Sequence, residues 1–215
     1  MYFSSAICFD DRLDAARQLA AQLSPLQLQH PLVLAIPRGA VPIGAVLADA
    51  LEGDLDVVLV HKLGAPYNPE FAIGAVDEHG NCVLAPEADP DSAWVREERA
   101  RQVALLQQRR DLFSAGREPF DPRGRTVIIV DDGLATGATM AAALRVTRAA
   151  LPLAQIAAAP VASPEALALV APLAERVVCL HAPADFRAVG QFYRSFPQVD
   201  EAEAVRLVRS HHRRH

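Results

Sequence analysis

The sequence has few of the residues that mark several common classes of protein. Its three cysteines, Cys8, Cys82 and Cys179, are widely spaced and form no C-x-x-C pair, which argues against a disulfide framework and against a zinc site. This usage fits a reducing compartment, and we expect a cytoplasmic protein. The first six residues have neither a basic start nor a long apolar core, so they do not predict a secretory signal.

The chain also lacks an excess of basic residues. Its 21 Lys and Arg residues face 26 Asp and Glu residues, for a net charge of −5, which argues against nucleic acid or an anionic membrane as a partner. The apolar stretch 153–174 is interrupted by Pro160, Pro164 and Pro172, so no membrane span is predicted. With 215 residues and 51% hydrophobic content, the chain can bury a core as a single domain over 1–215.

Two common phosphate-binding motifs, the P-loop and the G-x-G-x-x-G fingerprint, are missing as well. A different strand, loop and helix pattern is present: the β-branched run 127–130, then Asp131 and Asp132, then a loop of small residues that leads into a helix. Amides and hydroxyls at a helix N-terminus can hold a phosphate. Because carboxylates would repel a phosphate, we expect the two acids to face ribose hydroxyls or to act through a divalent cation. The pattern predicts a sugar phosphate ligand.

This stretch resembles the ribose-5-phosphate motif of the type I phosphoribosyltransferases. The resemblance implies phosphoribosyl pyrophosphate as the ligand and Mg²⁺ as the cofactor. Asp131 and Asp132 would orient the ribose and bind the metal indirectly, and the 5′-phosphate would be held by Leu134, Ala135, Thr136, Gly137, Ala138 and Thr139. The alternative is an ordinary buried strand that ends in an acidic cap and a glycine turn.

A second strand, loop and helix unit is predicted around residues 32–51. The apolar run 32–36 is broken by Pro37-Arg38-Gly39-Ala40, and a helix follows from Val41 to Leu51. Arg38 and Gly39 suit the close approach of a cation and backbone to a polyanion. The loop resembles the pyrophosphate loop of the family, although a turn with a solvated arginine would have the same sequence.

The third predicted strand, 55–60, places His61 and Lys62 at its carboxyl end. Lys62 is the only lysine in the chain, and its ammonium would suit a pyrophosphate oxygen, unless its position is due to chance. The run 62–76 resembles a bacterial phosphoribosyltransferase-like subgroup, which makes Asn68 and Glu70 candidates for contact with substrate in a closed state. A β-hairpin is predicted from segments 72–76 and 82–84, where the family has a mobile loop.

Further strands at 155–162 and 176–180 alternate with helices, which predicts an α/β fold with a parallel sheet and flanking helices. Ligands of such sheets bind beyond the carboxyl ends of the strands, where Arg38, Lys62 and the two acids are all expected. A charged helix at 90–114, with an ion pair between Glu97 and Arg101, is predicted as an appendage to this fold.

Aromatic residues gather in the C-terminal segment 183–210, which would form a hood-like cover. By resemblance to purine-type enzymes, Asp185 and Phe186 are the positions that match an acid and an aromatic residue that hold a base. Packing of this segment against the core explains the same residues equally well.

Together these residues predict a phosphoribosyltransferase that transfers ribose-5-phosphate from phosphoribosyl pyrophosphate to a nitrogen acceptor such as a nucleobase and releases pyrophosphate. A second reading is a non-catalytic protein that binds phosphoribosyl pyrophosphate or a nucleotide and regulates a partner. A third is a hydrolase of phosphosugars. The resemblance favours a homodimer, and it does not identify the acceptor.

Overall fold

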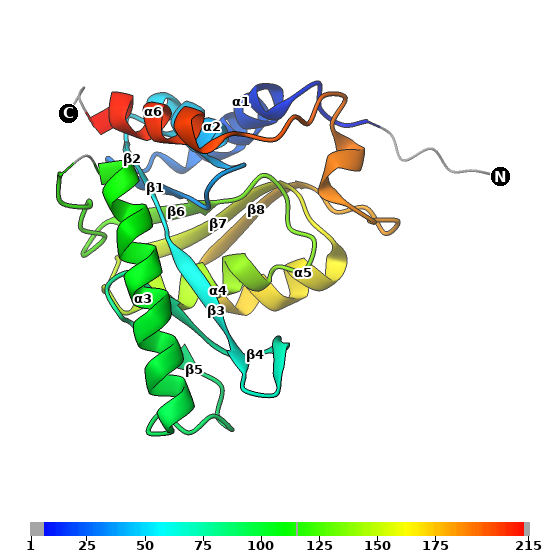
Figure 1. Cartoon of the computed structure of the whole chain (residues 1–215). Coiled ribbons are helices and arrows are strands. Elements are labelled where there is room, and N and C mark those ends of the chain that lie inside the picture. The colour runs from blue at the N-terminus through cyan, green and yellow to red at the C-terminus, as the bar shows by residue number, and fades with distance from the viewer. Residues whose placement is uncertain (1–6, 115, 213–215) are drawn as a thin grey trace.

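A computed structural model describes residues 7–114 and 116–212, except for the side chains of residues 69–72. Its main feature is a five-stranded sheet in which every neighbouring pair is parallel (Figure 1). The strand order is β2-β1-β6-β7-β8, with β1 at Leu32–Ala35, β2 at Asp54–Val57, β6 at Thr126–Val130, β7 at Ala154–Val161 and β8 at Arg176–His181. The predicted α/β class with a parallel sheet is confirmed.

Helices cover both faces of this sheet (Figure 1). One face carries α1 (Arg12–Leu23), α2 (Val41–Ala50) and α6 (Glu201–His212), and the other carries α4 (Ala138–Arg148) and α5 (Pro164–Val170). Alternate residues of β6 point to opposite faces, as strand geometry requires: Ile128 and Val130 pack toward the first group, and Val127 and Ile129 toward the second. All four are fully buried, which explains the run of β-branched residues.

The predicted third strand was wrong in one respect. The apolar run 55–60 is divided, because β2 ends at Val57 and a new strand, β3 (Val60–Ala65), begins in a second sheet. Val58 and Leu59 are buried where the chain crosses between the two sheets. The sequence is therefore apolar across the point where one strand ends and the next begins. Lys62 therefore lies within β3 and not at the carboxyl end of a central strand.

The second sheet is small and antiparallel, in the order β3-β4-β5, with β4 at Asn68–Asp77 and β5 at Cys82–Leu84. The hairpin predicted from 72–76 and 82–84 is confirmed, and β4 begins earlier than expected. Asn68 is exposed, whereas the side chain of Glu70 lies outside the described residues.

The charged helix is α3, at Ala93–Ser114. Its predicted ion pair was wrong, because Arg101 contacts Glu98 at 2.8 Å and not Glu97. The helix also buries more than an appendage would: Val95, Leu106 and Phe113 are in its buried face, together with the polar side chains of Gln102 and Arg110. Among the described residues, no helix has both the length and the apolar character needed to cross a membrane.

Short 3₁₀ helices complete the chain at η1 (Ser24–Leu26), η2 (Ala171–Leu173) and η3 (Val189–Phe192). η3 belongs to the aromatic segment that follows β8, and the backbone of this segment returns to the start of the described chain. The amides of Cys8 and Phe9 both donate to the carbonyl of Phe192, at 2.9 and 3.0 Å. The segment after β8 therefore meets the start of the described chain beside the carboxyl edge of the central sheet.

Candidate functional site

Two acids follow β6 at the carboxyl edge of the central sheet. The amide of Asp131 donates to the carbonyl of Ala158 at 3.1 Å, which continues the sheet, and the amide of Asp132 donates to Asp131 Oδ1 at 2.9 Å. Burial raises the pKa of Asp131 well above its ordinary range, and the neighbouring charge of Asp132 adds to this rise. A group that can place positive charge or hydroxyl donors beside Asp131 would therefore be bound favourably.

The loop after β1 meets these acids. A Cβ atom added to Gly39 would lie 2.1 Å from Asp132 Oδ2, so a larger residue there would have to displace the carboxylate. Arg38 precedes Gly39 through a cis peptide bond between Pro37 and Arg38 and is partly buried. The structure thus brings Gly39 and Asp132 together, because β1 and β6 are neighbouring parallel strands whose carboxyl ends lie at the same edge of the sheet.

The predicted phosphate loop runs from Leu134 to Thr139 into the N-terminus of α4. Its base is fixed, because Leu134 is buried, its amide donates to Val161 at 2.9 Å, and the hydroxyl of Ser163 donates to the carbonyl of Ala135 at 2.8 Å. Gly137 has a φ of +72° at the N-cap of the helix. The remaining members of the loop, Ala135, Thr136, Ala138 and Thr139, are exposed at the N-terminus of α4, where the amide of Ala138 donates to Thr136 Oγ1 at 3.4 Å.

Lys62 lies near the same helix, but it comes from β3 in the small sheet and not from the end of a central strand. It lines, together with Ala138, Ala141 and Arg145 of α4, a cavity of about 420 Å³ between the small sheet and that helix. The described residues that line this cavity contribute two cations and no carboxylate. This surrounding favours an anion near the N-terminus of α4.

Arg12 is a member of the site that the sequence did not reveal. Its guanidinium donates to Asp132 Oδ2 from Nε at 3.0 Å and from Nη2 at 2.8 Å, and Nη1 donates to the carbonyl of Pro197 at 2.6 Å. It also lies 3.7 Å from the ring centroid of Phe196. The sequence around Arg12 predicts only a packing helix, and no local pattern connects it to an acid 120 positions away.

The C-terminal segment covers the acids from the other side. The hydroxyl of Tyr193 donates to the carbonyl of Asp132 at 2.7 Å, and a Cβ on Gly133 would lie 2.4 Å from a methyl of Val189. The predicted base-binding residues lie in the same segment: Phe186 packs on Phe192 with ring centroids 5.3 Å apart, and Asp185 is exposed. The packing role expected for Phe186 is present, and a base-binding role remains a prediction.

The donor set can be tested against Mg²⁺. Among the described residues, no group of three or more His, Cys, Asp or Glu side chains could hold a metal ion. Asp132 Oδ2 is engaged by Arg12, whereas Asp131 Oδ1 accepts only an amide among the contacts described above. A cation at these residues would therefore have to be held mainly by the oxygens of a bound ligand.

Comparison with known proteins decides the family. Residues 9–192 match the family model described as "Phosphoribosyl transferase domain". The chain belongs to this family. The phosphoribosyl transferase match includes Arg12, the Gly39 loop, Lys62 and the acid pair, and it ends just before Tyr193.

Two relatives share much of their sequence with this domain. "Putative phosphoribosyl transferase Rv0571c" of Mycobacterium tuberculosis (strain ATCC 25618 / H37Rv) is 42% identical over 209 residues, which are 95% of this chain and 47% of that protein. The chain thus spans about half the length of the curated relatives it matches. The crystal structure of TT1426 from Thermus thermophilus is 44% identical, has a TM-score of 0.88, and covers 94% of this chain and 98% of its own.

A more distant solved structure shares the fold alone. It is that of a hypothetical protein from Neisseria gonorrhoeae with bound ppGpp, at 16% identity and a TM-score of 0.54, and the alignment covers 98% of this chain and 99% of that one. The phosphoribosyl transferase domain is therefore established here by the family model and by the sequence identity of the nearer relatives.

Proposed function

We propose that this phosphoribosyl transferase domain binds phosphoribosyl pyrophosphate with Mg²⁺ and transfers ribose-5-phosphate to a nitrogen acceptor such as a nucleobase, releasing pyrophosphate. The observation that carries the proposal is the contact of Gly39 with Asp132, because it places the loops after β1 and β6 side by side. One loop begins with the acid pair and leads into a helix N-terminus, and the other carries Arg38. Ribose, 5′-phosphate and pyrophosphate would each find a chemically matched partner there.

Each part of the ligand would be bound by residues of matching charge or hydrogen-bonding capacity. Asp131 and Asp132 would accept hydrogen bonds from the ribose hydroxyls, and the amides of residues 134–139 would hold the 5′-phosphate. Arg38 with Gly39, and Lys62, would bind the pyrophosphate and stabilise it as the bond to ribose C1 breaks. Mg²⁺, when bound with the ligand, would neutralise part of the pyrophosphate charge.

Positive charge develops on the ribose as that bond breaks, as it does in glycoside cleavage. Asp131 is suited to stabilise this charge, because the burial that raises its pKa also removes the water that would screen its ionised carboxylate from a positive group. Asp185 and Phe186 are the positions we assign to the acceptor, with the ring available for stacking on a base.

The test is calorimetric titration of phosphoribosyl pyrophosphate into the wild type and into Asp131→Asn, with and without Mg²⁺. We expect Mg²⁺-dependent binding near micromolar, about −8 kcal/mol, that weakens in the variant. Absence of binding in the wild type would refute the proposal.

The regulatory alternative is separated from the enzyme by pyrophosphate release. A panel of nucleobases and amines is added to the protein with phosphoribosyl pyrophosphate and Mg²⁺. Release that depends on one acceptor supports the transferase, binding without release for any acceptor supports a sensor, and release with water alone supports a hydrolase. In the transferase case, Phe186→Ala should raise the KM for the acceptor and leave the affinity for phosphoribosyl pyrophosphate unchanged.

A further inference from the structure

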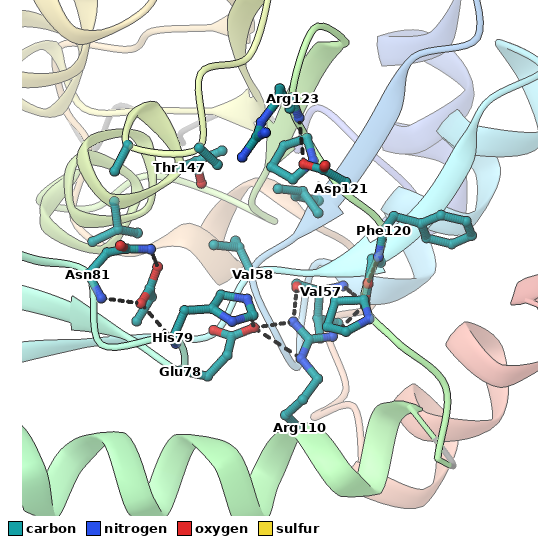
Figure 2. Close-up of a pocket in the computed structure, with 18 of the residues that line it drawn as sticks. Val57, Val58, Glu78, His79, Asn81, Arg110, Phe120, Asp121, Arg123 and Thr147 are labelled. Atoms are coloured by element: carbon teal, nitrogen blue, oxygen red, sulfur yellow. Dashed lines mark hydrogen bonds and ion pairs between the residues drawn. The ribbon is translucent and has the colours of Figure 1, made fainter.

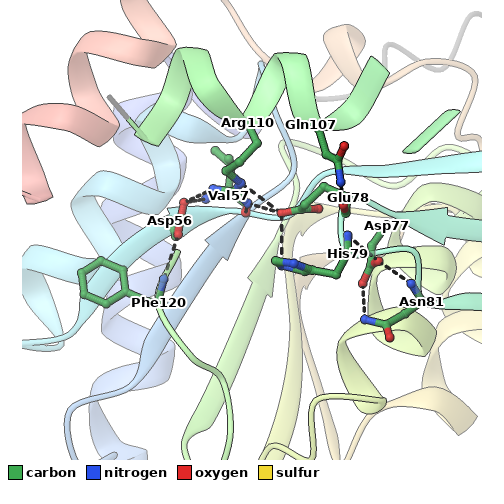
Figure 3. A network of polar contacts seen from close by, with 9 residues as sticks. All are labelled: Asp56, Val57, Asp77, Glu78, His79, Asn81, Gln107, Arg110 and Phe120. Atoms are coloured by element: carbon green, nitrogen blue, oxygen red, sulfur yellow. Dashed lines mark hydrogen bonds and ion pairs between the residues drawn. The ribbon is translucent and has the colours of Figure 1, made fainter. Parts of the chain in front are cut away.

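A buried charged network lies away from the acid pair, near the C-terminal end of α3. The guanidinium of Arg110 donates to Asp56 Oδ1 at 2.6 Å, to the carbonyl of Val57 at 2.7 Å, and to Glu78 Oε1 from Nε at 3.0 Å and from Nη2 at 2.5 Å (Figure 3). The exposed fractions are 8% for Arg110, 1% for Asp56 and 6% for Glu78. Buried charges of this kind must be paired closely to be tolerated, so their geometry is fixed.

The partners of Arg110 belong to different sheets. Asp56 and Val57 are the last residues of β2 in the central sheet, and Glu78 directly follows β4 in the small sheet. The chain passes between the two sheets at residues 58–59, immediately beyond this contact. The guanidinium of Arg110 therefore bonds to both sheets at the crossing. Its N–H donors have a fixed planar geometry, so they constrain the relative orientation of the two sheets, which apolar packing alone does not do.

The helix that carries Arg110 also holds the small sheet along its length. Trp94 Nε1 donates to the carbonyl of Gly64 at 3.3 Å, Arg99 Nη2 to that of Gly80 at 2.5 Å, and Gln107 Nε2 to that of Glu78 at 3.2 Å. These bonds join α3 to β3 and to the turn between β4 and β5. The helix and the small sheet thus form one unit, and Arg110 ties that unit to β2.

The same network borders a cavity. Its volume is about 440 Å³, and Arg110 and Glu78 line it together with residues 118–123 and the C-terminal end of α4 near Thr147 (Figure 2). Because the turn that carries Glu78 has no packing contacts across this cavity, its position depends on the bonds that Arg110 makes to it.

We propose that Arg110 is a positioning residue that fixes the small sheet, and Lys62 within it, relative to the N-terminus of α4. Lys62 is only two residues beyond the start of β3, and it pairs with Ala75 of β4 in the strand register. A shift of the small sheet at the crossing therefore moves Lys62 relative to Ala138 across the cavity that both residues line. The part of this inference that concerns catalysis rests on the proposed function.

Amide hydrogen exchange tests the mechanical part without any ligand. Arg110→Met should speed exchange of the β3, β4 and β5 amides roughly 10- to 100-fold and leave β1 and β6 unchanged. Arg101→Met is the matched control, since Arg101 lies on the same helix with a side chain 65% exposed and should change neither sheet. Equal changes in both sheets, or none in the small sheet, would overturn the proposal. If Arg110→Met does not fold, Arg110→Lys is used instead. It keeps the positive charge but lacks the planar set of N–H donors, and it should also speed exchange of the small-sheet amides.

A mutant cycle with Lys62 tests the functional part. Arg110→Met should weaken binding of phosphoribosyl pyrophosphate roughly 10-fold in the wild type and have no further effect in Lys62→Met, because the residue acts through Lys62. An equal loss in both backgrounds would show a merely structural role and contradict the proposal. If the wild type binds no phosphoribosyl pyrophosphate, the proposed function fails, and hydrogen exchange alone then decides whether Arg110 fixes the small sheet.

Discussion

Arg12 contacts Asp132 through two nitrogen atoms of one guanidinium, at 3.0 and 2.8 Å, and both bonds end on the same oxygen, Oδ2. The side chains are 9% and 16% exposed, so little water competes for this pair. The arginine comes from the first helix and the acid from the loop after β6, and the contact therefore holds two distant parts of the chain at the candidate site.

The first prediction concerns this ion pair. Charge-assisted hydrogen bonds that are shielded from water contribute about 1.5–3 kcal/mol, so Arg12→Met should lower the free energy of unfolding by about this amount. A double-mutant cycle with Asp132→Asn, followed by urea unfolding, should give a coupling energy of similar size. Additive effects of the two substitutions would show that the pair contributes no net stability.

Asp131→Asn should separate stability from function. Burial and the charge of Asp132 raise the pKa of Asp131 above its ordinary value of 3.8, so the native state binds the proton more tightly than the unfolded state. Stability therefore falls as the pH rises from the ordinary pKa through the raised one, and the full penalty remains above it. The variant lacks this penalty, so its Tm should exceed that of the wild type at pH 8 and match it at pH 3.

The same variant should lose ligand binding or turnover. By the usual worth of a charged hydrogen bond, we expect roughly a 10- to 150-fold loss in affinity for phosphoribosyl pyrophosphate or in rate. A variant that is no more stable at pH 8 would contradict the role of burial, and one with unchanged affinity and rate would contradict the role in binding.

Gly39→Ala should damage the site by steric contact. The new methyl would lie 2.1 Å from Asp132 Oδ2 and must displace either the carboxylate or the loop, at a cost of about 1–3 kcal/mol in stability. We expect at least a tenfold loss of affinity for phosphoribosyl pyrophosphate by calorimetry. Gly124→Ala is the control, since its methyl would meet no atom within 4 Å, and although its φ of +68° adds a conformational cost, affinity should be retained.

Tyr193 should remain un-ionised in the folded protein. Burial, and then the charge of Asp132, raise the pKa of its phenol above the ordinary value of 10.0. Ionisation is therefore resisted by the fold, and stability should fall once the pH exceeds 10. The difference in phenolate absorbance between the wild type and Tyr193→Phe should stay near zero until alkaline unfolding, and a separate titration before unfolding would disprove this.

The parts of the site that could be predicted are those that depend on neighbouring residues in the chain. A β-branched run followed by Asp131 and Asp132 predicted a strand end with acids, and the parallel sheet then placed Gly39 beside them. Helix α3 was predicted over 90–114 and spans Ala93–Ser114, because its cap and turn signals are local.

The parts that could not be predicted depend on distance. Residues 55–60 form one apolar run in the sequence, and nothing in it marks the crossing into a second sheet, so Lys62 was predicted at the end of a central strand and not within β3. Arg12 and Arg110 were missed for a related reason: on a helix an arginine is usually a solvated residue, and its burial depends on acids 120 and 54 positions away.

The closure of the acid pair by the C-terminal segment has a consequence for how the protein folds. Arg12 reaches Pro197 across 185 positions, and Tyr193 reaches Asp132 across 61. Contacts between residues so far apart in the sequence form late, because closing a long loop costs chain entropy that other contacts must first offset. During synthesis the central strands can therefore assemble while Asp132 still lacks these partners, and the site becomes complete only after residue 197 has left the ribosome.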